Sequence, residues 1–388
     1  IIQPSNSRIN SKCNYVGDCG GCCWQQIDYE DQLIEKENII KNLFDDQEVE
    51  PIVRSPCIWH YRSKMEFSFS QDKSLNKYLG LMSCIDGRKV VDLGNCLISQ
   101  KWCLNILERI RSWWKKSDLL AYHPRHDTGS LRSVIMRSSI NTENKQVALI
   151  VSGNPDYALT RKDLISFAKT AAFDENTSVY LIIQKIEKKT PTVFYEMHLQ
   201  GSEVFQEKIK DFTFQVSPIS FLQPNIKIAE KIIDTIVEIM DLKPNQVILD
   251  LYCGVATIGI CISKYVKKVI AVEISKNAIC DARENIKLNK ITNLEVYESD
   301  VSKFLNEFQN FSTIDALLVD PPRSGLDKKT IEFINQVKPK KILYISCNPY
   351  TQKEDIDNFQ NFSIEKIVPF DQFPHTYHIE NIILLTSK

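Results

Sequence analysis

Long hydrophobic runs are missing from this sequence of 388 residues. The longest apolar stretches, such as IIDTIVEIM and ENIILLT, are interrupted by charge or fall well short of the roughly 18 residues that a membrane span needs. The first residues, IIQPSNSRINSK, lack the apolar core of a secretory signal. We therefore expect a cytoplasmic protein without a membrane partner. Because the chain begins with Ile rather than Met, we also expect it to start part-way through a longer protein or to have been processed.

A basic excess is missing as well. The 48 Lys and Arg residues are balanced by 49 Asp and Glu residues, so the formal net charge is −1. Proteins that bind nucleic acid through charge alone usually carry a basic excess. The composition therefore disfavours a non-specific RNA coat, although an enzyme with one local basic face remains compatible with it. The length predicts two or three domains.

Cysteine, in contrast, is abundant, with twelve residues in the chain. Three of them form the cluster Cys13-x5-Cys19-Gly-Gly-Cys22, while most others are scattered and read as small buried side chains. In a reducing compartment such a cluster indicates a metal site. Three thiolates need a fourth ligand to close a zinc or an iron–sulfur site, and the spacing alone does not choose between these two.

The first half of the chain predicts a mixture of helices and short strands. Apolar residues recur at helical spacing over 29–44, and a Trp-rich helix is predicted over 102–116. The alternating runs that predict strands are KMEFSFS, YLGLMS, KVVDLG, SVIMRSS, QVALIVSG, VYLIIQKI and FTFQVSP. This part is expected to form a smaller α+β domain.

After Pro218 the pattern changes to apolar strands that alternate with helices. A helix over 225–240 is followed by the runs VILDLYC, KVIAVEI, LEVYESD, IDALLVD and KILYISC. Such runs are typical of a parallel sheet that is covered on both faces. The last two runs, IEKIVPFD and IENIILLTS, are joined by a link too short for a crossover helix, so they predict an antiparallel pair at the sheet edge. A seven-stranded mixed sheet of this kind indicates the Rossmann-like class I methyltransferase fold.

Polar residues follow the first three of these strands, where an α/β sheet binds its ligands. The first strand leads into the turn Asp250-Leu-Tyr252-Cys-Gly254. Glu273 ends the second strand, where it is placed to accept both ribose hydroxyls of a nucleoside, and Asp300 ends the third, where it is placed to accept an adenine amino group. An acidic residue after the second strand repels a 2′-phosphate, which favours S-adenosylmethionine or NAD over NADP. The absence of G-x-G-x-x-G disfavours a dinucleotide, and a binding domain for another ligand remains an alternative.

A candidate nucleophile follows the fifth strand. Cys347 lies in Ser346-Cys-Asn-Pro349, while the fourth strand ends in Asp320-Pro-Pro-Arg323. Both segments are expected in one cleft, where a thiolate is the reactive form of cysteine. Enzymes that methylate exocyclic amines place an aromatic residue after D/N-P-P to stack the base, so Arg323 disfavours that reaction.

Methylation at a pyrimidine carbon fits these residues better. C5 of uracil is too weak a nucleophile by itself, but a thiolate that adds at C6 generates an enolate that can attack. A base must then remove the C5 proton, and Glu380 supplies a carboxylate between the last two strands, with His375 and His378 as alternatives. The target base must leave its stack to reach these groups.

Five motifs together resemble the RNA 5-methyluridine methyltransferase family. They are S-F-L-Q-P-N (220–225), D-L-Y-C-G (250–254), D-P-P-R-x-G (320–325), Y-I-S-C-N-P-x-T (344–351) and F-P-H-T-x-H-x-E (373–380). The resemblance implies Cys347 as nucleophile and Glu380 as base. It also implies S-adenosylmethionine contacts at Gln223, Tyr252, Thr257, Glu273, Asp300 and Asp320. The chain departs from the family pattern at Val255-Ala256 and Thr257.

The cysteine pattern resembles the cluster-bearing branch of the same family. This resemblance implies a [4Fe–4S] cluster held by Cys13, Cys19, Cys22 and Cys96, with Cys23 as a competing ligand and zinc as the alternative metal. It implies a central iron–sulfur and RNA-binding domain formed by residues 1–23 and 56–218, and a catalytic domain formed by residues 24–55 and 219–388. Many members carry a further RNA-binding barrel, which here would precede the first residue.

The expected partner is RNA, and we expect a monomer without an obligate protein partner. Cluster-bearing relatives mostly act on ribosomal RNA, which we favour, and the transfer RNA T-loop is the alternative. A non-catalytic RNA-binding protein on the same scaffold would need neither Cys347 nor Glu380. An iron–sulfur oxidoreductase would need a flavin motif or a redox-partner site, and neither is visible in the sequence.

Overall fold

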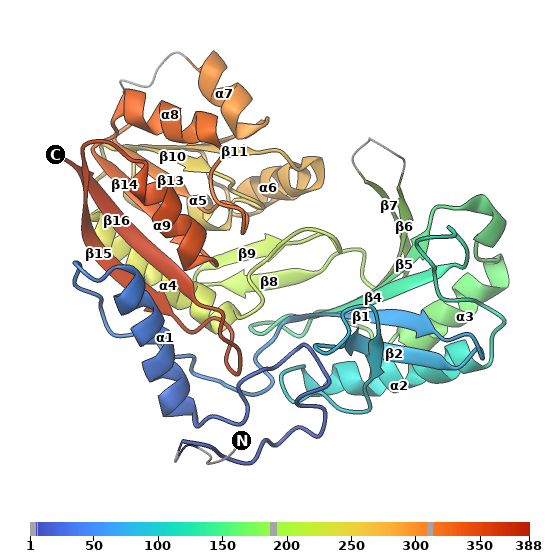
Figure 1. Ribbon diagram of the computed structural model, residues 1–388. Helices are drawn as coiled ribbons and strands as arrows, with labels where there is room; N and C mark the ends of the chain where they lie inside the picture. Colours follow the sequence, from blue (N-terminus) through green and yellow to red (C-terminus); the bar gives the residue numbers. More distant parts are fainter. Residues whose placement is uncertain (1–4, 6, 187–191, 309–312) are drawn as a thin grey trace. The chain divides into compact units, whose positions relative to one another are not determined.

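The chain forms two compact units (Figure 1). The computed structural model describes residues 5, 7–186, 192–308 and 313–388. Unit 1 contains the described residues of 1–7, 27–56 and 208–388, and unit 2 contains residues 8–26 and 57–207. Both units are therefore assembled from discontinuous segments, and the segment 27–56 belongs with the C-terminal half.

The segment 208–218 shows how the units differ from the predicted division, which places it in the central domain. It contains β9 (Phe212–Gln215), which pairs with β8 (Gln206–Ile209). The backbone N–H groups of Thr213 and Gln215 donate to the side chains of Asn289 and Asn285 at 2.9 and 2.7 Å. These bonds fix β9 to the helix α6 (Lys276–Leu288) and its C-cap, so this segment is part of unit 1.

Unit 1 is built on a seven-stranded mixed sheet. Its strands, within the described residues, are β10 (Val247–Leu251), β11 (Lys268–Glu273), β12 (Leu294–Glu298), β13 (Ala316–Val319), β14 (Lys341–Ser346), β15 (Phe362–Phe370) and β16 (Glu380–Ser387). They are ordered β12-β11-β10-β13-β14-β16-β15. The first five are parallel, and β16 is antiparallel to both β14 and β15. The methyltransferase-type sheet predicted from the sequence is confirmed, including its terminal antiparallel pair.

Helices cover both faces of this sheet, as its almost wholly apolar strands require. Among its described residues, unit 1 has the helices α1 (Tyr29–Leu43), α4 (Ile226–Met240), α5 (Thr257–Ile262), α6, α7 (Val301–Glu307), α8 (Lys328–Val337) and α9 (Pro349–Asp357), with the short 3-10 helix η2 (Ser263–Tyr265). Apolar residues of α1, α7, α8 and α9 share one core cluster with the strands. The helices α4, α5 and α6 lie on the other face (Figure 1).

Unit 2 contains a second sheet with a different topology. Its strands, as far as the structure describes them, are β1 (Lys64–Gln71), β2 (Lys77–Met82), β3 (Val90–Asp92), β4 (Leu131–Ser138), β5 (Lys145–Ser152), β6 (Thr177–Lys185) and β7 (Val193–Gln200), in the order β3-β2-β1-β4-β5-β6-β7. All neighbours are antiparallel except β5 and β6. The helices α2 (Lys101–Lys115) and α3 (Arg161–Ala171) join its core, where the rings of Trp113 and Phe167 lie 5.3 Å apart, and the 3-10 helix η1 (Pro155–Tyr157) precedes α3.

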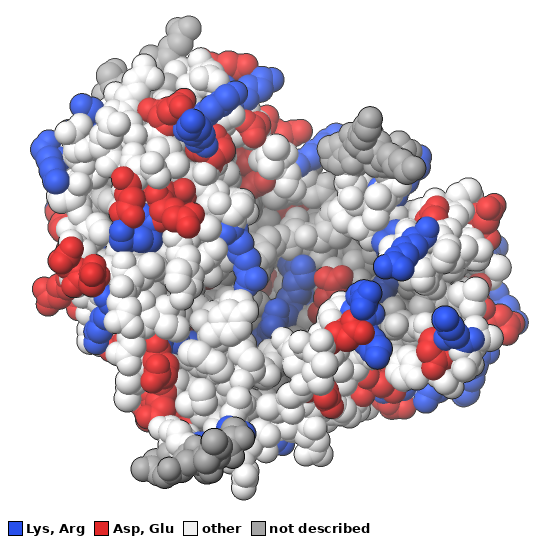
Figure 2. Space-filling model, in the orientation of Figure 1, with Lys and Arg blue, Asp and Glu red and all other residues white. Residues whose placement is uncertain are grey.

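Within the described segments, no helix combines the length and the apolar character that crossing a membrane requires. Over the face of unit 1 that Figure 2 shows, Lys and Arg side chains are intermingled with Asp and Glu side chains.

Candidate active site

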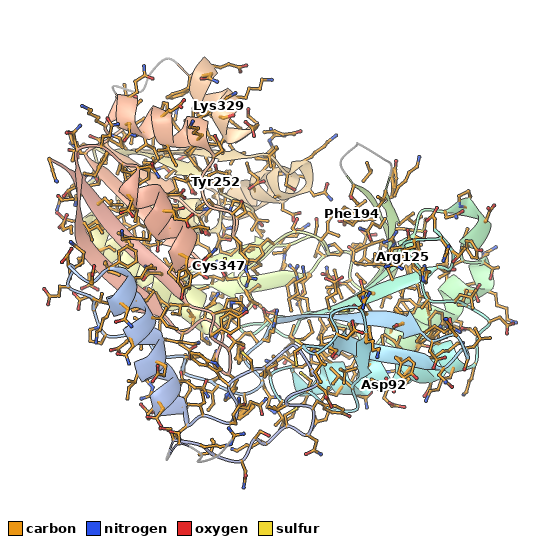
Figure 3. All side chains as sticks on the ribbon, viewed as in Figure 1. Asp92, Arg125, Phe194, Tyr252, Lys329 and Cys347 are labelled. Carbon is orange, nitrogen blue, oxygen red and sulfur yellow. The ribbon has the colours of Figure 1, made fainter. Side chains whose placement is uncertain are left out.

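The carboxyl ends of the parallel strands bring the predicted site residues of unit 1 to one edge of its sheet. Tyr252 follows β10, Asp320 follows β13 and Cys347 follows β14. These three strands are neighbours in the order β10-β13-β14. Tyr252 and Cys347 accordingly lie at the same edge of the sheet, beyond the carboxyl ends of its parallel strands (Figure 3).

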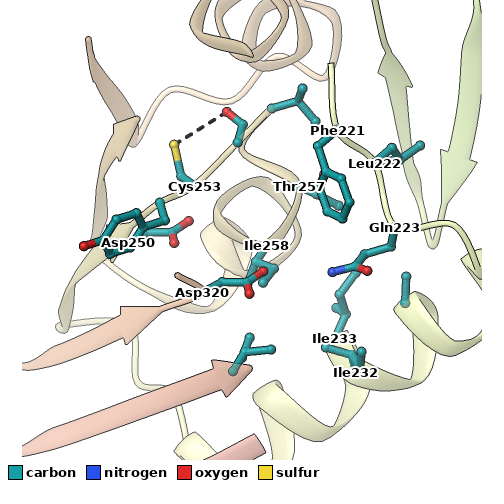
Figure 4. A pocket seen from close by; sticks show the side chains of 15 residues that line it. Phe221, Leu222, Gln223, Ile232, Ile233, Asp250, Cys253, Thr257, Ile258 and Asp320 are labelled. Atoms are coloured by element: carbon teal, nitrogen blue, oxygen red, sulfur yellow. Dashed lines mark hydrogen bonds between the residues drawn. The ribbon is translucent and has the colours of Figure 1, made fainter. Parts of the chain in front are cut away.

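A pocket with an empty volume of about 620 Å³ lies at this edge (Figure 4). Its lining includes four residues that the sequence singles out as cofactor contacts, namely Gln223, Tyr252, Thr257 and Asp320. Apolar side chains, including those of Leu222 and Ile258, supply much of the rest of the wall. An apolar cavity with a few convergent polar groups is the usual form of a small-molecule site.

The pocket also contains an acidic residue to which the sequence analysis assigns no role. Asp250, in the middle of the apolar run VILDL, is only 1% exposed and lines the pocket with Asp320. Burial and the charge of Asp320 raise the pKa of Asp250 well above its usual value, and burial raises the pKa of Asp320 to about 7. Within the described residues, Oδ2 of Asp250 has no hydrogen-bond partner. A ligand that carries positive charge would compensate the buried Asp250 and the partly buried Asp320 beside it.

The turn after β10 is held in an uncommon backbone conformation. Tyr252, Gly254 and Ala256 have φ angles of 64°, 55° and 60°, and Ala256 is completely buried. The left-handed region costs a residue with a Cβ about 1–2 kcal/mol. Ala256 therefore occupies, at some cost, a position that suits the glycine expected there from the sequence pattern. Strain of this kind is concentrated at functional sites.

The other two predicted cofactor residues do not line this pocket. Glu273, at the end of β11, accepts the backbone N–H of Gly254 at 3.1 Å and that of Ser275 at 2.7 Å, so its carboxylate supports the turn after β10. Asp300 is the N-cap of α7 and accepts the backbone N–H of Lys303 at 3.1 Å. Both residues follow the carboxyl ends of their strands, as expected, but each has a local structural partner.

Cys347 and Glu380 are brought together by the pairing of β14 with β16. Ser346, the last residue of β14, is opposite Asn381 in this antiparallel pair. One further step along the register places Cys347 opposite Glu380. The charge of Glu380 is one of the causes that raise the pKa of the Cys347 thiol.

Both groups are held in a partly water-excluded environment. Burial, together with the charge of Glu380, raises the pKa of the Cys347 thiol, while the guanidinium of Arg323 lowers it. Burial and the charge of Asp320 raise the pKa of Glu380 well above its usual value, and Arg323 again opposes the shift. The cation beside the thiol therefore favours the anionic form of both the thiol and the carboxyl.

The loop that carries Arg323 is tied to the loop that carries Cys347. The carbonyl of Arg323 accepts hydrogen bonds from the side chains of Asn348 at 3.0 Å and Thr351 at 3.2 Å. Gly325 has a φ of 79°, and a Cβ at this position would lie 2.6 Å from Oδ2 of Asp355. These contacts fix the segment 320–325 to the segment that follows β14.

A second pocket opens beside the thiol, with an empty volume of about 860 Å³. It is lined by Arg323, Cys347, Tyr350, Tyr377 and His378, among others. Nη2 of Arg323 lies 3.4 Å from Nδ1 of His378. The alternative base His375 lies elsewhere: it is buried, and its backbone N–H donates to Oε1 of Gln32 at 2.9 Å.

In unit 2 the predicted metal ligands line one small pocket. Cys13, Cys19, Cys22 and Cys96 surround an empty volume of about 320 Å³. Apolar side chains such as Leu81, Leu93 and Ile98 form its remaining wall. The backbone N–H of Gly20 donates to the carbonyl of Met82 at 2.9 Å, which fixes the cysteine loop to the end of β2. The competing residue Cys23 is exposed and does not line this pocket.

These thiols interact electrostatically, so each affects the pKa of its neighbours. Burial, with smaller contributions from the neighbouring thiols, raises the pKa of Cys19 to about 11 and that of Cys22 to about 12. Cys84, which the sequence analysis does not single out, also acts on Cys19 but is exposed. In the described parts of the chain, no group of three or more His, Cys, Asp or Glu side chains is arranged to hold a metal ion.

Comparisons with known proteins cover the whole chain. The profile of the tRNA (uracil-5-)-methyltransferase family matches residues 176–388. An uncharacterized RNA methyltransferase of Protochlamydia amoebophila is 42% identical over 100% of this chain and 93% of its own length, and one of Caldanaerobacter subterraneus is 32% identical over 100% and 87%. The crystal structure of the Pyrococcus abyssi tRNA (uracil-54, C5)-methyltransferase in complex with S-adenosyl-L-homocysteine superposes with a TM-score of 0.77 at 27% identity, covering 100% of this chain and 88% of that one.

Proposed function

This chain belongs to the RNA 5-methyluridine methyltransferase family, and we propose that it methylates C5 of a uridine in RNA through a covalent bond between Cys347 and C6. The observation that supports this proposal is the register of β14 and β16, which pairs Ser346 with Asn381, the residues next to Cys347 and Glu380. A binding protein on the same scaffold would have no use for that pair.

The two residues divide the reaction between them. The Cys347 thiolate forms a bond to C6, and the electron pair of the C5–C6 double bond moves to C5 and the adjoining carbonyl as an enolate. C5 then bonds to the methyl carbon as the bond between that carbon and the donor sulfonium breaks. The Glu380 carboxylate takes the C5 proton, the C5–C6 double bond forms again, and the C6–S bond breaks to release the thiolate.

S-adenosylmethionine, when bound, supplies the methyl group for this reaction. Its amino group and sulfonium are positively charged, and the carboxyls of the buried Asp250 and the partly buried Asp320, which line the pocket, suit such a ligand. Gln223, Tyr252 and Thr257 would complete the contacts in this pocket. Glu273 and Asp300 follow the next two strands, β11 and β12, and would hold the ribose and the adenine.

For unit 2 we propose a [4Fe–4S] cluster held by Cys13, Cys19, Cys22 and Cys96. All four line one pocket with an apolar wall, and no other cysteine lines it. The resemblance of the pattern Cys13-x5-Cys19-Gly-Gly-Cys22 to the cluster-bearing branch of the family favours the cluster, with zinc as the alternative metal. Its role is structural or RNA-positioning, because the reaction moves no unpaired electron.

The target RNA decides between two versions of the proposal. We favour ribosomal RNA, with the T-loop uridine of transfer RNA as the alternative. Unmodified transcripts of both are incubated with the protein and S-adenosylmethionine, and nuclease fragments are mapped by mass spectrometry. The proposal predicts 5-methyluridine at one site in the ribosomal transcript. Methylation of the transfer RNA alone supports the alternative, and RNA binding without 5-methyluridine in either transcript contradicts the proposed function.

A further inference from the structure

Two exposed tyrosines lie at the mouth of the pocket beside the reactive thiol. Tyr350 is 57% exposed and Tyr377 is 56% exposed, and both line this pocket. Tyr350 is three residues after Cys347, and Tyr377 is three residues before Glu380. Each chain segment that carries a proposed catalytic group therefore also presents a largely solvent-exposed aromatic ring.

The backbone of Tyr350 and the ring of Tyr377 are each held by a neighbouring side chain. Tyr350 lies in the first turn of α9, and its backbone N–H donates to Oδ1 of the N-cap Asn348 at 3.3 Å. The ring of Tyr377 packs against His378 at a centroid distance of 4.5 Å, and His378 packs edge-on against Phe373 at 6.0 Å. An aromatic ring that is fixed before binding loses little conformational entropy when a ligand covers it.

The pocket is also larger than the reaction requires. Pockets of about 300–1,000 Å³ hold whole drug-sized ligands, and the cavity volume of this one, about 410 Å³, exceeds what a single uracil ring would fill. It is lined by one cation, Arg323, so electrostatic attraction to phosphates is a weak explanation for the extra space. Exposed aromatic rings bind the faces of unstacked bases without regard to sequence.

We propose that Tyr350 and Tyr377 form a stacking subsite for the nucleotides that flank the target uridine. The subsite takes bases of single-stranded or locally opened RNA, and it rests on the proposed function because the target base must occupy the same pocket. Stacking on the two rings would replace the contacts that the flanking bases lose when the uridine leaves the helix.

Binding of fluorescein-labelled octauridylate, measured by fluorescence anisotropy at one fixed salt concentration, tests this subsite. Tyr350→Ala and Tyr377→Ala should each weaken binding by about 5- to 150-fold, the range for loss of one stacked base. Tyr350→Phe and Tyr377→Phe should bind within about twofold of the wild type, because the ring is retained. The control is Tyr265→Ala. Tyr265 is a 37%-exposed tyrosine of unit 1 that lines neither this pocket nor the pocket lined by Asp250 and Asp320. Its replacement should leave the octauridylate affinity unchanged.

A second probe separates stacking from contacts with the RNA backbone. An octamer with the same phosphodiester backbone and abasic sugars should bind the wild type and the alanine variants equally. Thermal unfolding midpoints, recorded in parallel, should be unchanged because both side chains are exposed. Wild-type octauridylate affinity in the alanine variants, or no octauridylate binding by the wild type, would overturn the subsite.

Failure of the stacking subsite can be distinguished from failure of the proposed function. If the wild type methylates uridine but the alanine variants bind octauridylate normally, the subsite is wrong and the function stands. If no transcript is methylated but the alanine variants lose affinity for octauridylate, the function is wrong and the base-binding site stands.

Discussion

Nζ of Lys36 lies 2.5 Å from Oδ1 of Asp371, and both side chains are almost completely buried. Lys36 also donates to the carbonyl of Phe373 at 3.1 Å, and the hydroxyl of Tyr29 donates to the other carboxylate oxygen of Asp371 at 2.7 Å. Through these bonds α1 holds the segment that leads into Glu380. The helix is thus a support for the proposed base, although it does not touch the reacting atoms.

Loss of this ion pair should affect both stability and turnover. Lys36→Met leaves Asp371 buried without its cation, and breaking a buried pair in this way costs about 3–5 kcal/mol. We expect a lower thermal unfolding midpoint, together with a lower kcat from displacement of the loop before Glu380. Differential scanning calorimetry and steady-state methylation assays measure the two effects.

The same helix offers a matched control. Lys41 is 51% exposed and pairs with Glu37 at 3.1 Å, so Lys41→Met should cost no more than about 1 kcal/mol. The double variant Lys36→Met/Asp371→Asn removes both charges and should recover part of the lost stability. Equal effects of Lys36→Met and Lys41→Met would show that the buried pair has no special role.

Activity should rise with pH, because both proposed catalytic groups act as anions and both have raised pKa values. Below the pKa of the Cys347 thiol, kcat/KM should increase by about tenfold per pH unit. Arg323 lowers the pKa of the thiol, so Arg323→Gln should move this rise to higher pH. A pH profile that is flat between pH 6 and 9, or that Arg323→Gln leaves in place, contradicts the assignment.

Replacement of the base should separate methylation from release. Glu380→Gln keeps the size of the side chain but cannot accept the C5 proton, so the C6–S bond should persist after methyl transfer. We expect a protein–RNA adduct to accumulate on natural uridine RNA, visible as a retarded band on a denaturing gel. Release at the wild-type rate would point to His375, His378 or water as the base.

The proposed cluster should be visible in the purified protein. Anaerobically prepared protein should be brown and should contain about four irons per chain, because thiolate-bound iron–sulfur clusters absorb in the visible range and zinc sites do not. Serine at any of the four pocket cysteines, Cys13, Cys19, Cys22 or Cys96, should bleach the protein and destabilise unit 2.

Two further cysteines serve as controls for this assignment. Cys23 lies outside the pocket and Cys347 belongs to unit 1, so Cys23→Ser and Cys347→Ala should keep the colour. Colourless protein with one bound zinc would contradict the cluster. Colour that is lost with Cys23→Ser but kept with Cys96→Ser would contradict the ligand set alone.

The sequence predicts the parts of this molecule that follow from local patterns. The strands of both sheets that were expected from apolar runs are present, and α4 begins directly after its N-cap Asn225. The short link before β16 correctly indicates an antiparallel edge pair. Cys347 directly follows the parallel strand β14, and Glu380 is the first residue of β16, the last strand of the chain. This order along the chain suffices to suggest a common site.

The features that the sequence does not predict depend on contacts between residues that are far apart in the chain. β7 presents Val193, Tyr195 and Met197 to solvent, so its sequence lacks a clear pattern of one buried and one exposed face. Lys36 reads as an ordinary surface position of an amphipathic helix, and its partner Asp371 is 335 residues away. Asp250 could have been singled out from the sequence, because a carboxylate inside the apolar run VILDL has to be buried with the strand.

The most direct test of the account is covalent trapping on RNA that contains 5-fluorouridine at the target position. Fluorine at C5 cannot leave as a proton, so the methylated intermediate should remain bonded to the protein and survive a denaturing gel. With S-adenosylmethionine present, the account predicts a stable adduct whose RNA is attached to the peptide that contains Cys347, and no adduct with Cys347→Ala. An adduct that persists in Cys347→Ala would contradict the assignment of Cys347 as the nucleophile.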